Sequence, residues 1–407
     1  MVQCIQVYEQ ERLQVGQRGF SALHWSYLAS YLERAAHSKY FSLQTNGVKF
    51  KNYVGVIQIE DLVIEILPKT DRDGQSADGQ KVLLEMLRIC KLLPIEAVGF
   101  AHLRTYSNHI LELYIELFLG ELEKLYRRGF LKKYRKVQAF QTKINGRLLL
   151  NKQLHQIRKD RFYLDRQIFD YNHIVHGNLL ACLLLLKQFP LRVSNHTKVQ
   201  RFIYHFQELG VTPVWKVESL GLTAEMHCYQ AVTDIAYLLL RNKRPDIRFG
   251  QERMIALLFD MNILFEEYIY QQLLLHASPD VKVRRQLSKN FWQRHTIRPD
   301  ILVEIEGQKI ILDTKWRMLK RAQPSADDLK QLFVYMNYFN APTAFLLFPR
   351  AGQLADQPPI PYAPNEHLPQ LWCGLSFCDI VQHGQLNIQL GKELLENLRM
   401  YQNQLPT

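Results

Sequence analysis

The 407-residue sequence has no long apolar run, few cysteines and no closely paired cysteine motif. Its most apolar stretch, 174–186, contains His176 and Asn178 and ends at Lys187, so it is too short and too polar to span a bilayer. The six cysteines are scattered without CxxC spacing, so neither a disulfide framework nor a zinc site is expected. Residues 1–10 lack the apolar core of a secretory signal. These absences predict a cytoplasmic protein with reduced thiols and no membrane association.

A complete nucleotide-binding loop is also missing. Gly74 and Gly79 have the spacing of a phosphate loop, but Gln80, Lys81 and Val82 follow where Lys and then Ser or Thr are required. The segment 69–80 is therefore predicted to be a surface loop, rich in Asp and Gly. We do not expect this chain to hydrolyse nucleoside triphosphates by itself.

The composition is that of a folded protein with a positive charge. Hydrophobic residues make up 47% and charged residues 22%, and 51 Lys and Arg against 39 Asp and Glu give a net charge of +12. This length corresponds to two or three domains, and the charge favours a polyanionic partner such as nucleic acid. The densest basic run, 127–136, is interleaved with aromatic residues. It could bind phosphates while Tyr134 stacks on a base, or it could be a solvated helix end.

Local patterns predict a mixed α/β chain. Residues 54–59 and 62–67 are rich in β-branched residues and predict a hairpin. The segment 82–186 has a helical pattern. Residues 242–250 form a candidate boundary loop between domains, and the Pro-rich segment 352–364 is expected to be irregular.

A second hairpin is predicted within residues 297–316. The apolar triplets 301–303 and 310–312 are typical of strands buried on both faces, and Glu306 and Gly307 suit a two-residue turn. With that turn, paired residue numbers add up to 613. Ile305 is then opposite Gln308, Glu304 opposite Lys309, and Asp300 opposite Asp313.

The facing carboxylates of Asp300 and Asp313 should repel each other, and a divalent cation would relieve the repulsion. Lys315 lies two residues after Asp313 and therefore on the same face of the strand. Two carboxylates and a lysine suit phosphodiester hydrolysis, in which the carboxylates bind Mg²⁺ and the ammonium orients or deprotonates water or stabilises the transition state. The alternative is a structural ion pair between Asp313 and Lys315.

These residues resemble a known signature. Arg298-Pro299-Asp300, followed by Asp313-Thr314-Lys315, is similar to the catalytic motif of PD-(D/E)xK nucleases. Gln331 and Tyr335 resemble the QxxxY helix motif of the RecB-like branch, and as i and i+4 residues they share one helix face. The resemblance implies a site-support or DNA-contact role for both, although ordinary helix packing is an alternative. Glu266 matches the acidic residue of the preceding helix, which can join the metal site, but it could equally face solvent.

Over residues 50–340 the chain resembles the McrC family, the nuclease subunits of McrBC 5-methylcytosine restriction systems. The segments 55–69 (GVIQIEDLVIEILPK) and 145–154 (NGRLLLNKQL) carry this resemblance together with the nuclease motif. It implies an N-terminal α+β region, 1–245, which engages an AAA+ partner, and a PD-(D/E)xK restriction-endonuclease-like domain, 246–407.

The resemblance further implies a Mg²⁺-dependent endonuclease that cleaves DNA when assembled with a McrB-like AAA+ GTPase hexamer, whose activity it stimulates. The partner would recognise methylated double-stranded DNA. A free-standing RecB-like nuclease in repair or defence is the alternative, and a non-enzymatic protein with a relic nuclease core is a third hypothesis.

Overall fold

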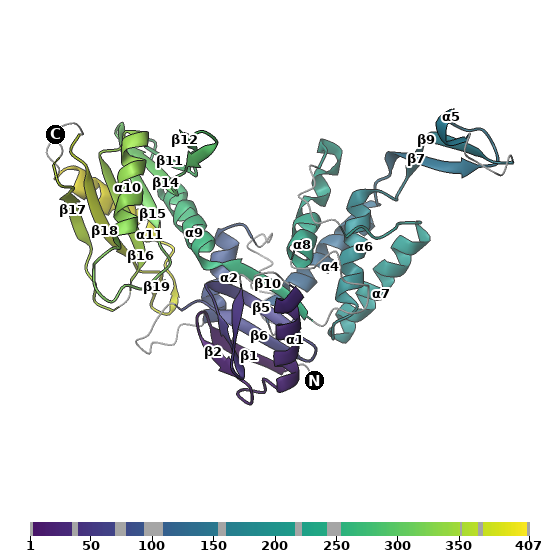
Figure 1. Cartoon of the computed structure of the whole chain (residues 1–407), viewed down its shortest axis with the longest axis horizontal. Coiled ribbons are helices and arrows are strands. Elements are labelled where there is room, and N and C mark those ends of the chain that lie inside the picture. Colours follow the sequence, from purple (N-terminus) through teal and green to yellow (C-terminus); the bar gives the residue numbers. More distant parts are fainter. Residues whose placement is uncertain are drawn as a thin grey trace. The chain divides into compact units, whose positions relative to one another are not determined.

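The computed structural model describes residues 3–34, 40–69, 79–92, 109–153, 160–215, 222–241, 254–350, 352–364 and 369–404 (Figure 1). The fold is mixed α/β, as the sequence predicts. Two compact units form, both discontinuous in sequence. One consists of Met1–Cys4, Ile57–Val63 and Gly99–Leu257, and the other of Ile5–Val56, Ile64–Val98 and Leu258–Thr407. The domains 1–245 and 246–407 stay a prediction, and the boundary loop 242–250 lies outside the described residues.

Two small sheets and two helices are built largely from the first 90 residues. The three-stranded sheet has the order β2 (Arg12–Gln14), β4 (Gly47–Phe50), β3 (Phe41–Gln44). The four-stranded sheet has the order β1 (Gln3–Tyr8), β6 (Leu62–Leu67), β5 (Tyr53–Ile59), β10 (Met254–Asp260). The helices are α1 (Ala22–Arg34) and α2 (Gly79–Ile89).

The neighbouring strands β5 and β6 confirm the first predicted hairpin. Its turn contains Glu60, whose φ of 53° is the left-handed conformation that a tight turn requires. The predicted surface loop 69–80 ends earlier than expected, because α2 begins at Gly79. Residues 70–78 of this loop lie outside the described part of the chain.

A helical group follows, and it corrects the prediction that 82–186 is helical throughout. Its members are α4 (Ile110–Arg128), α6 (Ile174–Leu186), α7 (Val193–Glu208), the 3-10 helix η1 (Ala224–Tyr229) and α8 (Gln230–Leu240). Between α4 and α6 lies a sheet of order β7 (Lys133–Gln141), β9 (Phe162–Asp170), β8 (Arg147–Leu148), with the short helix α5 (Leu150–Gln153). The pairing of β7 with the distant β9, which includes the ion pair Arg135–Asp170, outweighs the local helical pattern.

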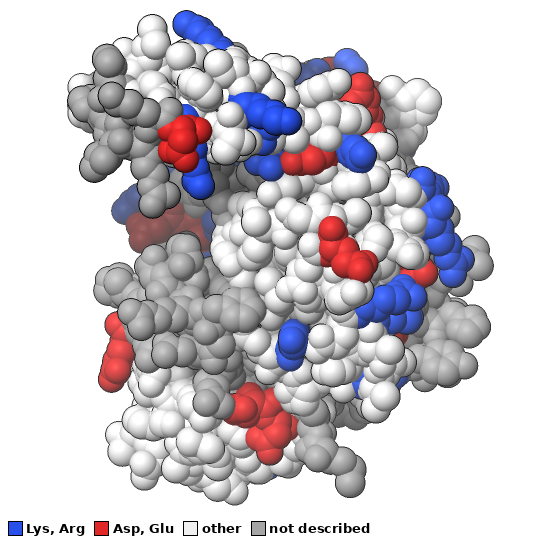
Figure 2. Space-filling model, turned by 90° about the vertical axis from the view of Figure 1, so that its right-hand side faces the viewer, with Lys and Arg blue, Asp and Glu red and all other residues white. Residues whose placement is uncertain are grey.

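The basic run 127–136 is not a single helix end. Helix α4 ends at Arg128, Gly129 has a φ of 86°, and β7 begins at Lys133. Tyr134 is 71% exposed on β7. Phosphate binding by the run, with Tyr134 stacking on a base or sugar, stays a prediction. Figure 2 shows one face of the molecule, on which the Lys and Arg side chains drawn are dispersed among Asp, Glu and uncharged residues. The net charge is therefore not gathered into one patch among the residues coloured there.

The largest sheet has six strands in the order β11 (Val281–Arg285), β14 (Ile301–Ile305), β15 (Gln308–Thr314), β16 (Thr343–Pro349), β18 (Trp372–Cys378), β17 (Gln357–Pro361). Strands β15, β16 and β18 are parallel, and the other pairings are antiparallel.

The remaining elements are three helices and two strand pairs. The helices are α9 (Met261–His276), α10 (Ala326–Phe339) and α11 (Leu390–Gln402). The strand pairs are β12 (Lys289–Trp292) with β13 (His295–Ile297), and β19 (Val381–Gln382) with β20 (Gln385–Leu386). The segment 352–364 contains β17 at Gln357–Pro361, so the expectation that it is irregular is wrong for these residues and holds for the rest of the segment.

Helices cover both faces of this sheet. Leu332 and Met336 of α10 belong to one buried apolar cluster with Ile311 and Leu346 of the sheet. The ring of Phe345 points to the opposite face, because successive strand residues alternate, and contacts Tyr401 of α11 at 5.6 Å between centroids. None of the helices in the described ranges combines the length and hydropathy that a membrane crossing needs.

The second predicted hairpin is formed by β14 and β15. Ile305 pairs with Gln308 and Glu304 with Lys309, as predicted, and the regular pairing ends at Ile301 with Leu312. Glu306 and Gly307 have φ values of 51° and 84°, so both turn residues are left-handed, as in a type I′ turn. The predicted register of the hairpin is confirmed up to the position before Asp300 and Asp313.

Candidate active site

Strand β15 carries Asp313 to the end of the sheet. Asp313 lies two residues after Ile311, which packs under α10, so both side chains face that helix. The carboxylate of Asp313 is 1% exposed, and its Oδ2 lies 2.7 Å from Nζ of Lys315. The backbone N–H of Lys315 donates to the carbonyl of Leu347 on β16, which holds Lys315 beside the sheet after β15 has ended.

Asp300 immediately precedes β14 and lies close to the end of β15. Its Oδ2 accepts hydrogen bonds from the backbone N–H of Thr314 at 2.7 Å and from the Thr314 hydroxyl at 2.9 Å. Thr314 therefore fixes the carboxylate of Asp300 beside Asp313. Sequence reasoning did not single out Thr314, although its position between Asp313 and Lys315 was the available signal.

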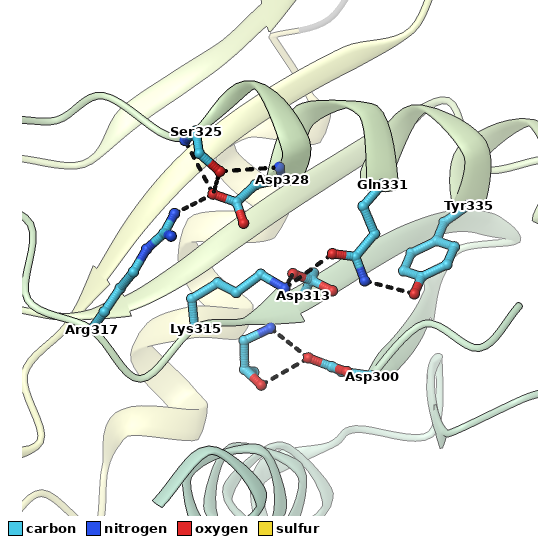
Figure 3. A network of polar contacts seen from close by, with 9 residues as sticks. Asp300, Asp313, Lys315, Arg317, Ser325, Asp328, Gln331 and Tyr335 are labelled. Carbon is cyan, nitrogen blue, oxygen red and sulfur yellow. Dashed lines mark hydrogen bonds and ion pairs between the residues drawn. The ribbon is translucent and has the colours of Figure 1, made fainter. Parts of the chain in front are cut away.

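Helix α10 brings the QxxxY residues to the same place (Figure 3). Oε1 of Gln331 accepts a hydrogen bond from Nζ of Lys315 at 3.1 Å. Nε2 of Gln331 donates to the hydroxyl of Tyr335 at 2.7 Å. A continuous polar chain thus runs from Asp313 through Lys315 and Gln331 to Tyr335.

Glu266 projects from α9 and is held by a different residue. Its Oε1 accepts a hydrogen bond from Nε2 of Gln286 at 2.9 Å. Burial raises the pKa of Glu266, and the negative charge of Asp300 raises it further. Within the described ranges, however, no three His, Cys, Asp or Glu side chains are close enough to form a metal-binding cluster. The structure thus brings together Asp300, Asp313, Lys315, Gln331 and Tyr335, and Glu266 is linked to them through the charge of Asp300.

Burial and like charge perturb Asp313 strongly. Burial raises its pKa to about 6, the negative charge of Asp300 acts in the same direction, and Lys315 opposes both. Burial lowers the pKa of Lys315, but the charges of Asp313 and Asp300 outweigh this effect and raise it. Lys315 is therefore an ammonium ion at neutral pH. Carboxyl groups whose pKa is shifted by burial and by a neighbouring charge are common at functional sites.

A second layer of contacts supports α10, and sequence reasoning missed it. Ser325 caps the helix by accepting a hydrogen bond from the backbone N–H of Asp328, and the carboxylate of Asp328 accepts from the backbone N–H of Ser325. Arg317, two residues after Lys315, forms an ion pair with the same carboxylate. The signal in the sequence was the Ser-x-x-Asp capping pattern.

The donor set fits a hard divalent cation. Oδ1 of Asp313 is buried and has no hydrogen-bond partner among the described residues, which is costly unless something compensates. Carboxylate oxygens are the ligands that Mg²⁺ prefers, usually one or two of them with water completing the shell. Asp300 and Asp313 could therefore hold such a cation without a third protein ligand.

Fold and site together define a mixed α/β protein with an acidic and lysine-containing site at one end of a six-stranded sheet. A family model described as "McrBC 5-methylcytosine restriction system component" matches residues 48–349. The chain therefore belongs to this family.

One solved structure shares the fold, and a second gives a weaker match. A refined half-complex from a tetradecameric assembly of Thermococcus gammatolerans McrB AAA+ hexamers with bound McrC matches with a TM-score of 0.63 and 18% identity, covering 97% of this chain and 100% of that chain. A cryo-EM structure of the Thermococcus gammatolerans McrBC complex matches with a TM-score of 0.46 and 18% identity, covering 68% of this chain and 89% of that chain. No curated protein matches the sequence.

Proposed function

We propose that this chain is the metal-dependent endodeoxyribonuclease subunit of a McrBC-type restriction system. The observation that carries the proposal is the buried carboxylate of Asp313, which lies 2.7 Å from the Lys315 ammonium with Asp300 beside it. Membership of the restriction-system family supports DNA phosphodiester bonds as the proposed substrate of this arrangement.

Asp300 and Asp313 would hold the cation. When bound, Mg²⁺ supplies a water of lowered pKa and offsets negative charge on the phosphate. Lys315, as an ammonium ion, would orient the attacking water and stabilise the negative charge of the transition state. Its raised pKa makes it a poor proton acceptor, so the structure favours this role over that of a general base.

Gln331 would position Lys315 and not react itself. Its amide oxygen accepts one of the three hydrogens of the ammonium group, and the Tyr335 hydroxyl fixes the orientation of the amide. The remaining hydrogens of Lys315 can then point to Asp313 and to the phosphate. Preorganisation of this kind avoids reorganisation during the reaction.

We further propose a McrB-like AAA+ GTPase hexamer as the partner. The structural match with a TM-score of 0.63 is an assembly of McrB AAA+ hexamers with bound McrC. The absence of a complete phosphate loop from the sequence suits a division of labour in which the partner hydrolyses GTP and recognises methylated double-stranded DNA.

A cleavage assay with and without the partner tests this function. The purified chain is mixed with methylated or unmethylated duplex DNA and Mg²⁺, in the presence or absence of a McrB-like AAA+ GTPase and GTP. We expect efficient cutting of methylated DNA only in the complete mixture, together with faster GTP hydrolysis by the partner. Robust cutting by the chain alone would contradict the proposed dependence on a partner.

A further inference from the structure

A small antiparallel ribbon projects from the large sheet. In sequence it lies between Gln286, the partner of Glu266, and Asp300 of the candidate active site. It comprises residues 287–299, with β12 and β13 as its strands, and we call it the basic ribbon (Figure 1). Its two ends are held together by a hydrogen bond from the backbone N–H of Gln286 to the carbonyl of Asp300 at 2.9 Å. Gln286 also binds Glu266. The basic ribbon therefore begins and ends at the site.

The charge of this region has one sign. Residues 281–299 contain no Asp or Glu, although they include several Lys and Arg residues. Lys282 and Arg285 lie on β11, before the basic ribbon, and form ion pairs with Glu304 of β14 and Glu267 of α9, respectively. Arg294, in the turn of the basic ribbon, is exposed. A cationic projection of this kind is complementary to a polyanion.

The tip of the basic ribbon also exposes aromatic rings. Trp292 is 61% exposed, and its ring stacks on that of His295 across the ribbon, with 5.8 Å between centroids and an interplanar angle of 18°. The pairing shifts between Asn290 and Trp292, so Phe291 is left out of the regular register. An exposed indole of this size, with its large apolar area and one N–H donor, is typical of residues that contact a partner.

Helix α10 fixes the basic ribbon relative to the catalytic groups. The Lys289 ammonium donates to the carbonyl of Tyr338 at 2.6 Å, and the Phe291 ring contacts the Tyr338 ring at 5.5 Å between centroids. A two-stranded ribbon is only marginally stable by itself, so these contacts are what hold it in place. Because α10 also carries Gln331 and Tyr335, the basic ribbon and the site are both in contact with the same helix.

We propose that the basic ribbon binds duplex DNA next to the phosphate that is cut. Arg294 contacts the phosphate backbone, and the stacked pair of Trp292 and His295 contacts the groove, into which a two-stranded ribbon fits. This inference rests on the proposed nuclease function for the identity of the polyanion. It adds a surface that positions the duplex relative to Asp300 and Asp313.

Binding of fluorescent duplex DNA by the full chain carrying Asp313→Ala tests the proposal without interference from cleavage. Trp292→Ala should weaken the affinity about ten-fold, as expected when an aromatic residue is lost from an interface, and Trp292→Phe should retain most of it. Arg294→Ala should weaken binding. It should also make the negative slope of log affinity against log salt concentration shallower by about 1, because one phosphate contact is lost. Tyr204→Ala and Lys392→Ala, exposed residues of α7 and α11, are the matched controls and should bind normally.

Two results would overturn the proposal. One is DNA affinity in the Trp292→Ala and Arg294→Ala variants equal to that of the controls. The other is loss of assembly with the AAA+ protein in these variants with unchanged DNA affinity, which would make the basic ribbon a protein contact. The nuclease proposal fails separately: if the unsubstituted chain with its partner does not cut DNA but the ribbon variants still lose affinity, the ribbon assignment stands and the catalytic one does not.

Discussion

The ammonium group of Lys315, just beyond β15, donates a hydrogen bond to the side-chain oxygen of Gln331 on α10 at 3.1 Å. This contact joins the strand that carries the acidic motif to the helix that follows it. Gln331 in turn donates to Tyr335. The contact implies that α10 orients Lys315. This role can be tested by substituting Gln331 or Tyr335 while Lys315 is left in place.

Gln331→Ala should lower the single-turnover cleavage rate of the assembled system about ten-fold, because a hydrogen bond to a charged group is lost. Tyr335→Phe should have a smaller effect, since it removes only the hydroxyl that accepts from Gln331. DNA affinity and GTPase stimulation should be unchanged in both variants. If Tyr335→Phe were as slow as Gln331→Ala, the hydroxyl would have a role beyond orienting the amide.

Removal of the ammonium group should be more severe. Lys315→Ala should lower the cleavage rate by about 100-fold or more, as expected when a group that stabilises transition-state charge is deleted. Lys315→Arg keeps the charge but changes its geometry and should recover only part of the rate. Lys330→Ala, an exposed lysine on α10, is the control. A rate for Lys315→Ala equal to that of this control would reduce Asp313 and Lys315 to a structural ion pair.

The β14–β15 hairpin is the part of the fold that could be predicted best. Its two apolar runs and its Glu306-Gly307 turn set the register, and with it the proximity of the two aspartates. The polar chain through Gln331 could be suggested only by resemblance, because the distance between a helix and a strand is decided by packing. Thr314 was missed because a hydrogen bond to the side chain of Asp300 leaves no periodic signal.

The strands β7 and β9 show the opposite case. Along β7 the residues alternate between half-buried and exposed, so neither face presents the continuous apolar stripe that identifies a strand. The partner strand begins more than 20 residues later, and its pairing is invisible to a local window. Charged and aromatic residues next to a well-formed helix therefore suggested a continuation of that helix.

Cation binding should depend on pH through Asp313. Because burial raises its pKa to about 6, a bound cation must displace a proton below this pH. Added Mg²⁺ should raise the unfolding temperature at pH 8, and the increase should disappear as the pH falls through about 6. Thermal unfolding at a series of pH values, with Mg²⁺ or a chelator, measures this difference.

Without a cation the pH effect has the opposite sign. The folded chain keeps a proton on Asp313 at pH values where the unfolded chain has lost it, so stability should decrease as the pH rises toward 6. Asp313→Asn should abolish the Mg²⁺ effect, whereas Asp327→Asn, a 94% exposed carboxyl on α10, should preserve it. An equal Mg²⁺ effect in Asp313→Asn would place the cation elsewhere.

The cap of α10 should contribute to stability. Ser325→Ala should lower the free energy of unfolding by about 1 kcal/mol, which is typical for a lost N-cap. Asp328→Ala should cost more, because the carboxylate binds both Ser325 and Arg317 and is 7% exposed. Urea unfolding measures both, with Asp327→Ala as a control within about 0.5 kcal/mol of the unsubstituted chain. Equal stability of Asp328→Ala and Asp327→Ala would show that the cap is unimportant.

A buried contact ties the residue after Lys315 to the end of the first strand. The indole N–H of Trp316 donates to Oε1 of Glu9 at 2.7 Å, and both side chains are almost fully buried. Trp316→Phe should leave the Glu9 carboxyl with one donor fewer and cost about 1–3 kcal/mol in unfolding free energy. Urea unfolding of this variant at pH 7 provides the measurement, and a loss below 0.5 kcal/mol would contradict the expectation.

The most direct test of the account is cleavage of methylated duplex DNA by the chain carrying Asp313→Ala, assembled with its AAA+ partner and GTP. GTP hydrolysis is followed in the same reaction, and Asp327→Ala serves as the control. The account predicts that Asp313→Ala abolishes cleavage while assembly and GTPase stimulation continue at the level of the control. Cleavage by Asp313→Ala at the rate of the control would contradict the assignment of this carboxylate to the active site.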